Sequence, residues 1–249
     1  MSTGRLHPMS AAIREIAGIF AGMGFGIAYG PELEDEWYNF DALNVPADHP
    51  ARDMQDTFWT KEEKRRAPRT HTTSVTIRCL EQMAKDGTEE MRMIAPSKVF
   101  RNEATDMTHE AQFYQLDGFA VGPIGRITLA HLKGTFEQFY RAYLGEEAQV
   151  RFRPSFFPFT EPSVEIDVWF VPPGKEGRWL EVAGAGMLHP NVLRNAGLDP
   201  EKVQGFAFGG GIERLIMIKH GVPDVRLFHS GDIRFNHGFD IEKVVDTNN

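Results

Sequence analysis

The chain has 249 residues, of which 41% are hydrophobic and 25% are charged, an ordinary composition for one globular domain with a sizeable core. No apolar run approaches the roughly 18 residues of a membrane span, the N-terminus lacks a secretory pattern, and the single cysteine excludes an internal disulfide or a thiolate-rich zinc site. The net charge of −8, from 27 basic and 35 acidic side chains, does not fit a free-standing nucleic-acid binder, and together these features predict a cytoplasmic protein with no membrane contact.

The first part of the chain predicts a helix, a strand and then less regular segments. Apolar side chains at Met9, Ile13, Ile16 and Phe20 keep helical spacing, which predicts a helix from Pro8 to Met23 that a run of glycines ends. Residues 27–29 should enter a strand that stops at Gly30-Pro31. Next come an expected ordered loop over 39–55, a short extended piece over 56–59, and a basic run over 61–69 that we interpret as a solvated loop.

The remainder predicts helices around several strands. A helix over 74–85 should end at Asp86-Gly87, and Thr128 can cap a helix whose apolar positions keep helical spacing as far as Gly145. Residues 164–170 alternate between apolar and polar, which predicts a strand with one buried face, paired with a strand over 178–182. A final helix is expected over 211–220. Adjacent strand signals without regular alternation with helices indicate an α+β domain, an antiparallel β-sheet flanked by helices.

Two arginines are placed to bind phosphate. The chain has no G-x-x-x-x-G-K-[ST] sequence, so an ATP site in it would lack a P-loop, and arginine is a natural substitute because its planar guanidinium holds two phosphate oxygens at once. Arg101 follows an apolar, strand-like stretch, and Arg214 lies in the first turn of a predicted helix after three glycines. Taken singly, Arg101 also fits an ordinary surface arginine, and Arg214 a salt bridge at a helix start.

The joint order of several motifs is more specific than either arginine. Pro31, then the group from Arg101 to Asp117, then Gly209 to Arg214 resemble motifs 1, 2 and 3 of class II aminoacyl-tRNA synthetases. The match runs over residues 7–234 and narrows the resemblance to the family of phenylalanyl-tRNA synthetase α subunits. The segments that carry it are GPELE (30–34), NFDALN (39–44), HPAR (49–52), DTFW (56–59), RTHTT (69–73), FPFTEPS (157–163), GMLHPNVL (186–193) and GFAFG (205–209).

The resemblance implies a two-step reaction, in which the carboxylate of L-phenylalanine attacks the α-phosphorus of ATP and the adenylate then passes to the terminal ribose of tRNA(Phe). Positioning and charge neutralisation should dominate the first step, and no nucleophilic side chain is needed. The implied ATP ligands are Arg101 on the α-phosphate, Glu103 on the adenine amino group, Phe113 stacked on the adenine, Gly211, and Arg214 on the opposite face and γ-phosphate. His109 is expected either to touch phosphate or the tRNA end, or to make solvent contacts alone.

The amino-acid pocket needs an apolar slot for the ring and oxygen atoms for the ammonium group. Phe157 and Phe159, two apart in an expected strand, would share a face and meet the substrate ring edge to face, although core aromatics are the alternative. Gln115 and Asp117 likewise share a face, and the resemblance adds His71 and Thr73 to the site for the α-amino group. Family members often carry Glu at the position of Asp117. Ala207 is expected to set the depth of the pocket at the para position of the ring.

Magnesium should accompany ATP as a hard ion with oxygen ligands. Glu161 matches the family position assigned to that ion and is therefore the expected metal ligand. Glu181 is a second candidate, and a surface salt bridge is the alternative for both carboxylates.

The resemblance also implies a partner. In this family the α subunit forms a heterotetramer of two α and two β subunits, with motif 1, around Ile27 to Pro31, at a dimer interface. Residues 1–249 are expected to form one catalytic domain that lacks the N-terminal tRNA-binding helical arm and ends in a tail over 235–249, so the β subunit should handle much of tRNA(Phe). Two alternatives stay open: a non-catalytic scaffold paralogue, and a stand-alone ligase that passes activated phenylalanine to an acceptor other than tRNA.

Overall fold

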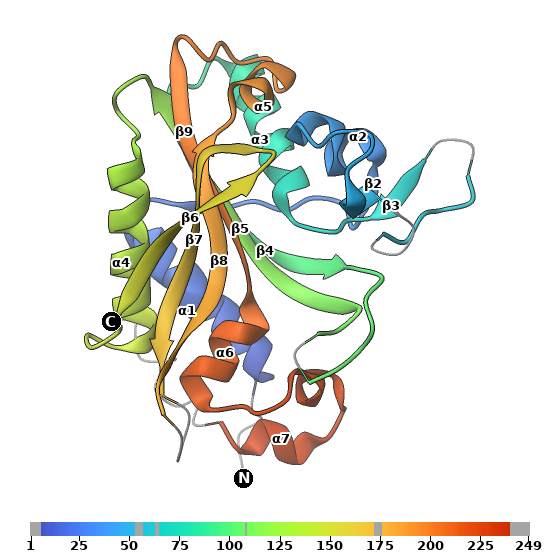
Figure 1. Ribbon diagram of the computed structural model, residues 1–249, viewed down its shortest axis with the longest axis vertical. Coiled ribbons are helices and arrows are strands. Elements are labelled where there is room, and N and C mark those ends of the chain that lie inside the picture. Colours follow the sequence, from blue (N-terminus) through green and yellow to red (C-terminus); the bar gives the residue numbers. More distant parts are fainter. Residues whose placement is uncertain (1–5, 53–56, 63–64, 108, 172–175, 240–249) are drawn as a thin grey trace.

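The computed structural model describes residues 6–52, 57–62, 65–107, 109–171 and 176–239. A seven-stranded sheet forms the centre of the molecule, in the order β1-β4-β5-β9-β8-β7-β6 (Figure 1). The strands are β1 (Gly26–Ile27), β4 (Met91–Phe100), β5 (Gln112–Pro123), β6 (Val150–Phe157), β7 (Thr160–Phe170), β8 (Arg178–Leu188) and β9 (Val203–Gly211). Neighbouring strands run antiparallel except β1, which lies parallel to β4. The predicted α+β architecture is confirmed, with β1 as the one departure from an antiparallel sheet.

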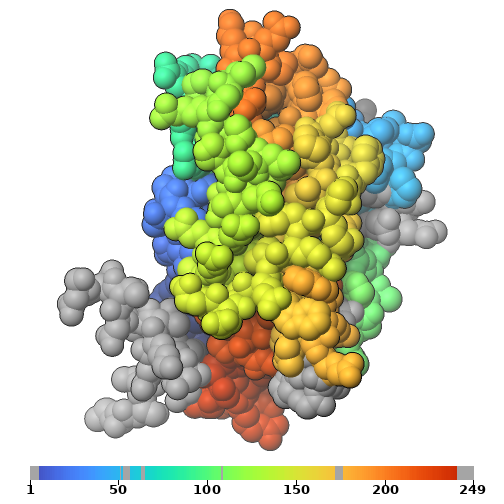
Figure 2. Space-filling model, turned by 60° about the vertical axis from the view of Figure 1, so that its left-hand side comes forward, coloured from blue at the N-terminus to red at the C-terminus, as the bar shows by residue number. Residues whose placement is uncertain are grey.

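One face of the sheet is covered by α1 (Pro8–Gly22), α4 (Leu129–Leu144) and α6 (Ile212–His220). Their apolar sides meet the even-numbered side chains of β9 in an aromatic core, where Phe208 lies 5.5 Å from Phe20 and 4.9 Å from Phe136 between ring centroids. In Figure 2, α4 runs down this side of the molecule beside the β6 edge, above the part of the chain coloured red. The three helices predicted for these stretches are confirmed to within a few residues.

The other face carries α3 (Thr73–Asp86), the short helix α5 (Pro190–Asn195) and the 3₁₀ turn η1 (Asp41–Leu43). These elements bury the odd-numbered side chains of β5 and β9, among them Phe119 and Ala207. Two faces with separate cores follow from the period of two along each strand. The amino-acid and nucleotide residues expected from the sequence lie on this second face or at its end.

A small lobe departs from the expected loops. The basic run is wrong as a solvated loop in its second half, because β3 (Arg66–Pro68) pairs with β2 (Leu33–Asp35). Part of the loop expected over 39–55 is instead helical, in η1 and η2 (Pro50–Arg52), and α2 (Glu36–Asn39) precedes it. The buried carboxylate of Glu34 receives two hydrogen bonds from Arg78 at 2.9 and 2.6 Å, which attaches the lobe to α3. Charge pairing of this kind leaves no periodic apolar pattern for sequence reasoning to find.

The predicted pairing of residues 164–170 with 178–182 is confirmed within β7 and β8, which register Trp169 against Trp179. The helix expected over 211–220 is confirmed as α6, although η3 (Val225–His229) and α7 (Ile233–His237) follow it. Parts of four expectations lie outside the described residues: 53–55 of the loop, Asp56 of the extended piece, 63–64 of the basic run and 240–249 of the tail. No helix within the described ranges has the length and apolar character to cross a membrane.

Candidate active site

A cavity of about 860 Å³ opens where β5, β8 and β9 meet the start of α6. All six predicted nucleotide ligands line it together: Arg101, Glu103, His109, Phe113, Gly211 and Arg214. Residues 107, 222, 223 and 225 form part of its wall, and the Val225 N–H donates to the Met107 carbonyl at 3.0 Å. Sequence reasoning gave this C-terminal stretch no role, and an irregular segment without motif or periodicity offers no signal for one.

Arg101 points into the cavity from the end of β4. Its backbone N–H donates to Ala111 at 2.9 Å, which continues the β4–β5 pairing by one residue and fixes where the side chain begins. The guanidinium Nε donates to the Thr70 carbonyl at 3.1 Å and its carbon lies 5.1 Å from the centroid of Phe113. Its Nη1 lies 3.8 Å from a Glu103 carboxylate oxygen. Three residues that the sequence assigns to one nucleotide therefore lie within reach of one another.

Arg214 lies on the opposite wall, in the first turn of α6. Its Nη1 donates to the backbone carbonyl of Glu181 at 2.8 Å, so the side chain is held along β8. The glycines before it let β9 pack closely, since a Cβ at Gly210 would collide with the carbonyl of Val182. The guanidinium keeps further N–H groups that a phosphate can use.

Glu213 has a structural role that sequence reasoning missed. Its side chain is buried beside Arg214, and Oε1 accepts a hydrogen bond from the Tyr114 N–H at 2.7 Å. This bond ties α6 to β5 at the residue between Phe113 and Gln115. Burial raises the pKa of Glu213 to about 7, and the nearby charge of Glu110 acts in the same direction. Its position directly before Arg214, in a helix's first turn, was the available signal.

The ammonium end of the proposed amino-acid slot centres on Asp117. Its carboxylate is buried and accepts from Thr73 Oγ1 at 2.6 Å and from Gln115 Nε2 at 2.7 Å, so the predicted trio is brought together. Burial raises the pKa of Asp117 to about 6, although these two hydrogen bonds and the charge of Arg101 act to lower it. A cationic ligand beside a buried carboxylate stabilises its ionised form, because the positive charge replaces the hydration that burial removes.

His71 lies two residues before Thr73, just ahead of α3. Its Nε2–H donates to the Asn39 carbonyl at 2.9 Å, which leaves Nδ1 as the lone-pair nitrogen, buried and without a hydrogen-bond partner among the described residues. Burial lowers the pKa of His71 to about 4, and the charge of Arg101 lowers it further. The ring is therefore neutral at pH 7 and presents an acceptor.

The aromatic end of the proposed amino-acid slot is separated from Asp117 by two paired glycines. Gly184 and Gly209 are register partners on β8 and β9, and a Cβ at Gly209 would collide with Asp117 Oδ1. A Cβ at Gly184 would lie 2.7 Å from the ring of Phe157. Opposite Cβ positions of an antiparallel pair are about 4.5–5.5 Å apart, so the carboxylate and the ring face the same short stretch of bare backbone. Both glycines and Gln115 also line the cavity, so it reaches this stretch of backbone, whereas Asp117, Phe157 and Phe159 are not among its lining residues.

Phe157 and Phe159 lie together for a different reason than expected. β6 ends at Phe157 and β7 begins at Thr160, so Phe159 belongs to the hairpin turn and not to a strand shared with Phe157. Their rings are stacked at 5.9 Å between centroids and 9° between planes. Phe159 packs against the same core that buries Ala207, which does not line the cavity itself. The turn thus brings two rings to one side of the slot.

The two carboxylates considered for magnesium are in different places. Glu181 lines the cavity near Arg214, and its pKa is raised by burial and by the charge of Glu165. Glu161 has a side chain 75% exposed, lies 3.5 Å from His189 Nε2 and does not line the cavity. Across the part of the chain that the structure describes, no three His, Cys, Asp or Glu side chains gather as a metal site.

Comparison with known proteins agrees with this geometry. Residues 1–239 match the family described as tRNA synthetases class II core domain (F). The phenylalanine--tRNA ligase alpha subunit of Syntrophomonas wolfei is 52% identical over 239 residues, which cover 93% of this chain and 68% of that protein. The subunit of the same name from Lysinibacillus sphaericus is 49% identical over 247 residues, covering 96% of this chain and 70% of that protein. The chain belongs to the class II aminoacyl-tRNA synthetases, in the family of phenylalanine--tRNA ligase alpha subunits.

Proposed function

We propose that this chain activates L-phenylalanine with ATP and transfers the activated amino acid to tRNA(Phe), as the catalytic α subunit of the ligase. The observation that carries the proposal is the continuity of one cavity from the arginine-lined nucleotide end to the glycine floor between Asp117 and Phe157. A carboxylate and a triphosphate can meet there without a covalent enzyme intermediate. Family membership supports the same activity.

In the first step a carboxylate oxygen of phenylalanine attacks the α-phosphorus, the bond to the β-phosphate oxygen breaks, and pyrophosphate leaves. Arg101 and Arg214, on opposite walls of the cavity, would neutralise phosphate charge as the bond forms and breaks. Phe113 would stack on the adenine once Arg101 turns from its ring to the phosphate. In the second step a hydroxyl of the terminal ribose attacks the adenylate carbonyl and AMP leaves.

At the amino-acid end, Asp117 and Gln115 would accept hydrogen bonds from the ammonium group, and His71 Nδ1 would supply a further acceptor. The phenyl ring would lie over the glycine floor against Phe157 and Phe159, with Ala207 at the closed end. Aromatic pairs of this kind contribute roughly 0.5–1.5 kcal/mol beyond area burial.

Magnesium would neutralise charge on the ATP phosphates and orient them. Glu181 fits this role by its chemistry: its carboxylate lies in the cavity, and a cation would relieve both its burial and its repulsion from Glu165. Glu161 offers a single exposed carboxylate, so an ion at that position would need oxygen ligands from ATP, water or another chain. Substitution of each carboxylate distinguishes the two positions.

We further infer a heterotetramer of two α and two β subunits, acting in the cytoplasm where tRNA is charged. The acidic net charge of −8 supports a division of labour in which the β subunit binds much of the tRNA backbone. The name of the relatives, an alpha subunit, supports a second type of chain.

Phenylalanine-dependent exchange of pyrophosphate into ATP tests the proposal. The purified chain is assayed alone, with the β subunit, and with tRNA(Phe), with tyrosine and leucine as competing amino acids. Exchange that requires phenylalanine, followed by charging of tRNA(Phe) when β is present, is the expected result. Absence of exchange in every combination would indicate a scaffold paralogue, and exchange without charging would indicate a ligase with another acceptor.

A further inference from the structure

Both ends of the amino-acid slot are attached to one short segment, residues 39–45, which we call the bracing segment. At its start, the Asn39 carbonyl accepts from His71 Nε2 at 2.9 Å. Near its end, Asn44 Nδ2 donates to the Pro158 carbonyl at 2.7 Å, and Pro158 lies between Phe157 and Phe159. The segment therefore contacts the polar end through a histidine and the aromatic end through a proline.

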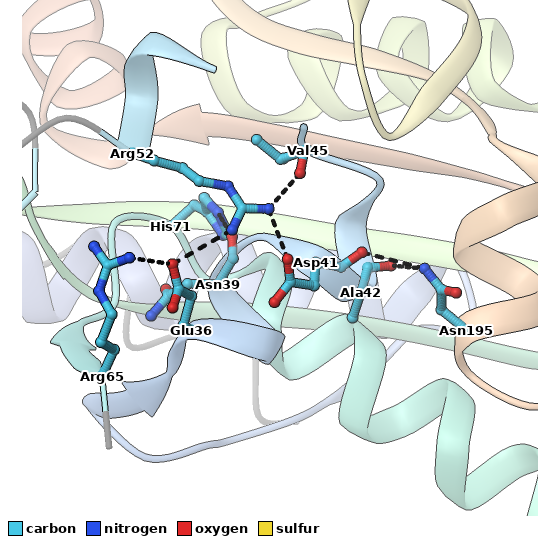
Figure 3. A network of polar contacts seen from close by, with 9 residues as sticks. All are labelled: Glu36, Asn39, Asp41, Ala42, Val45, Arg52, Arg65, His71 and Asn195. Atoms are coloured by element: carbon cyan, nitrogen blue, oxygen red, sulfur yellow. Dashed lines mark hydrogen bonds and ion pairs between the residues drawn. The ribbon is translucent and has the colours of Figure 1, made fainter. Parts of the chain in front are cut away.

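The bracing segment is itself fixed by Arg52. The Arg52 guanidinium donates to Asp41 Oδ1 at 2.8 Å and to the Val45 carbonyl, and so grips the turn on both sides of Asn44. Figure 3 shows this side chain reaching from η2 to Asp41 and Val45, with His71 behind it on the Asn39 carbonyl. The Arg52 side chain is only 9% exposed, and its Nη1 also reaches Glu36 at 3.5 Å. A buried arginine with three anchoring partners holds a turn more firmly than a surface ion pair does.

Asparagine suits position 44 because of both its backbone conformation and its side-chain hydrogen bonds. Its φ of 59° lies in the left-handed region, which asparagine tolerates better than most residues with a side chain. Its Oδ1 accepts from Asn191 Nδ2 at 2.9 Å, and Asn191 Oδ1 in turn accepts from Arg194 at 2.8 Å. Because Arg194 can only donate, these hydrogen bonds fix the orientation of the Asn191 amide and then of the Asn44 amide. The Asn44 Nδ2 group therefore faces the Pro158 carbonyl.

We propose that the bracing segment is a specificity-determining positioning element, which sets the separation between the ammonium end and the aromatic end of the slot through Asn39 and Asn44. The inference rests on the proposed function, because the bracing segment would position the groups that bind phenylalanine. Asn44 does not line the cavity and acts through Pro158. Loss of the Asn44 amide releases the Phe157–Phe159 turn while leaving the nucleotide cavity intact.

The test compares Asn44→Gly with Asn195→Ala in pyrophosphate exchange, using the full chain assembled with its β subunit. Glycine keeps the left-handed backbone and removes only the contact with Pro158 and Asn191. Asn195 is the matched control, because it donates from α5 to the Asp41 and Ala42 carbonyls at 3.2 Å each and so supports the same segment without touching the aromatic turn. Thermal unfolding of each variant records any general loss of structure.

For Asn44→Gly we expect kcat/KM for phenylalanine to fall about tenfold, since misplacement by about 1 Å can cost on the order of 100-fold. The KM for ATP should stay within about twofold, and the preference for phenylalanine over tyrosine and methionine should narrow. Asn195→Ala should resemble the unmodified protein. Asn44→Asp, which keeps the left-handed backbone and the Asn191 contact but lacks the donor, should reproduce the effect and serves if the glycine variant does not fold.

If the unmodified enzyme is active and the Asn44 variants keep both its KM for phenylalanine and its preference for phenylalanine over tyrosine and methionine, the inference is overturned but the proposed function is not. Equal losses for ATP and phenylalanine, or equal effects of Asn195→Ala, would also overturn it, because they indicate general loosening. An unmodified complex without phenylalanine-dependent exchange would overturn the proposed function, and the inference with it.

Discussion

Replacing Asp117 by asparagine should make the protein more stable and a worse enzyme. The folded-state pKa of about 6 stands above the ordinary value of 3.8, so between these values the folded state holds a proton that the unfolded state has released. The free energy of unfolding therefore falls as the pH rises from about 4 through the folded-state pKa of about 6, where the buried carboxyl group loses its proton. By linkage, the penalty of the ionised carboxylate grows from about 0.5 kcal/mol at pH 4 to about 3 kcal/mol at pH 8, at roughly 1.4 kcal/mol per pKa unit.

Asparagine removes this penalty and keeps the contacts, because its Oδ1 can accept from Gln115 and its Nδ2 can donate to the Thr73 hydroxyl. At pH 8 a gain of about 3 kcal/mol corresponds to a rise in Tm of about 6–12 °C for a domain of this size. The exposed Asp48→Asn variant removes the same charge from the surface and serves as the control. Urea unfolding of all three proteins from pH 4 to 8 measures the difference.

The reasoning also requires a cost in binding. The substrate ammonium loses a charged acceptor, which corresponds to about 10- to 100-fold in the KM for phenylalanine. A stability difference between Asp117→Asn and the unmodified protein that does not change with pH would refute the assigned burial cost. An unchanged KM for phenylalanine would refute the ammonium site.

Three further outcomes are expected. Ala207→Gly should admit para-halogenated phenylalanine in pyrophosphate exchange, because it deepens the closed end of the slot; unchanged discrimination would contradict this. Glu181→Gln should lower adenylation and raise the magnesium concentration needed for half-maximal rate while calorimetry shows phenylalanine binding retained; if Glu161→Gln alone does so, the ion belongs at the family position. Arg214→Lys should raise the KM for ATP at least about tenfold with phenylalanine binding unchanged, since lysine loses the planar fork, and equal effects on both substrates would argue against a phosphate role.

Sequence reasoning predicted the elements of this protein whose apolar residues recur at regular intervals. The helices over α1, α4 and α6 and the β7–β8 pairing carry apolar periodicity, and each is found. The nucleotide cavity also gathers residues that the motifs name. Glu213 and Asn44 act through single hydrogen bonds to distant backbone atoms, and one side chain with one distant partner leaves no repeating pattern to read. The Phe157–Phe159 turn differs because a hairpin reversal replaced an expected continuous strand.

The paired glycines Gly184 and Gly209 have a consequence for anyone who wishes to change the substrate range of this protein. A side chain at Gly184 would collide with the ring of Phe157, and one at Gly209 would collide with the carboxylate of Asp117, so both positions have to stay glycine for those two side chains to keep their places. A mutant library at these two positions would displace Phe157 or Asp117 and would add no room for a substrate. Room for larger substrates has to come from the walls and the closed end, at Phe157, Phe159 and Ala207, where atoms exist to be removed.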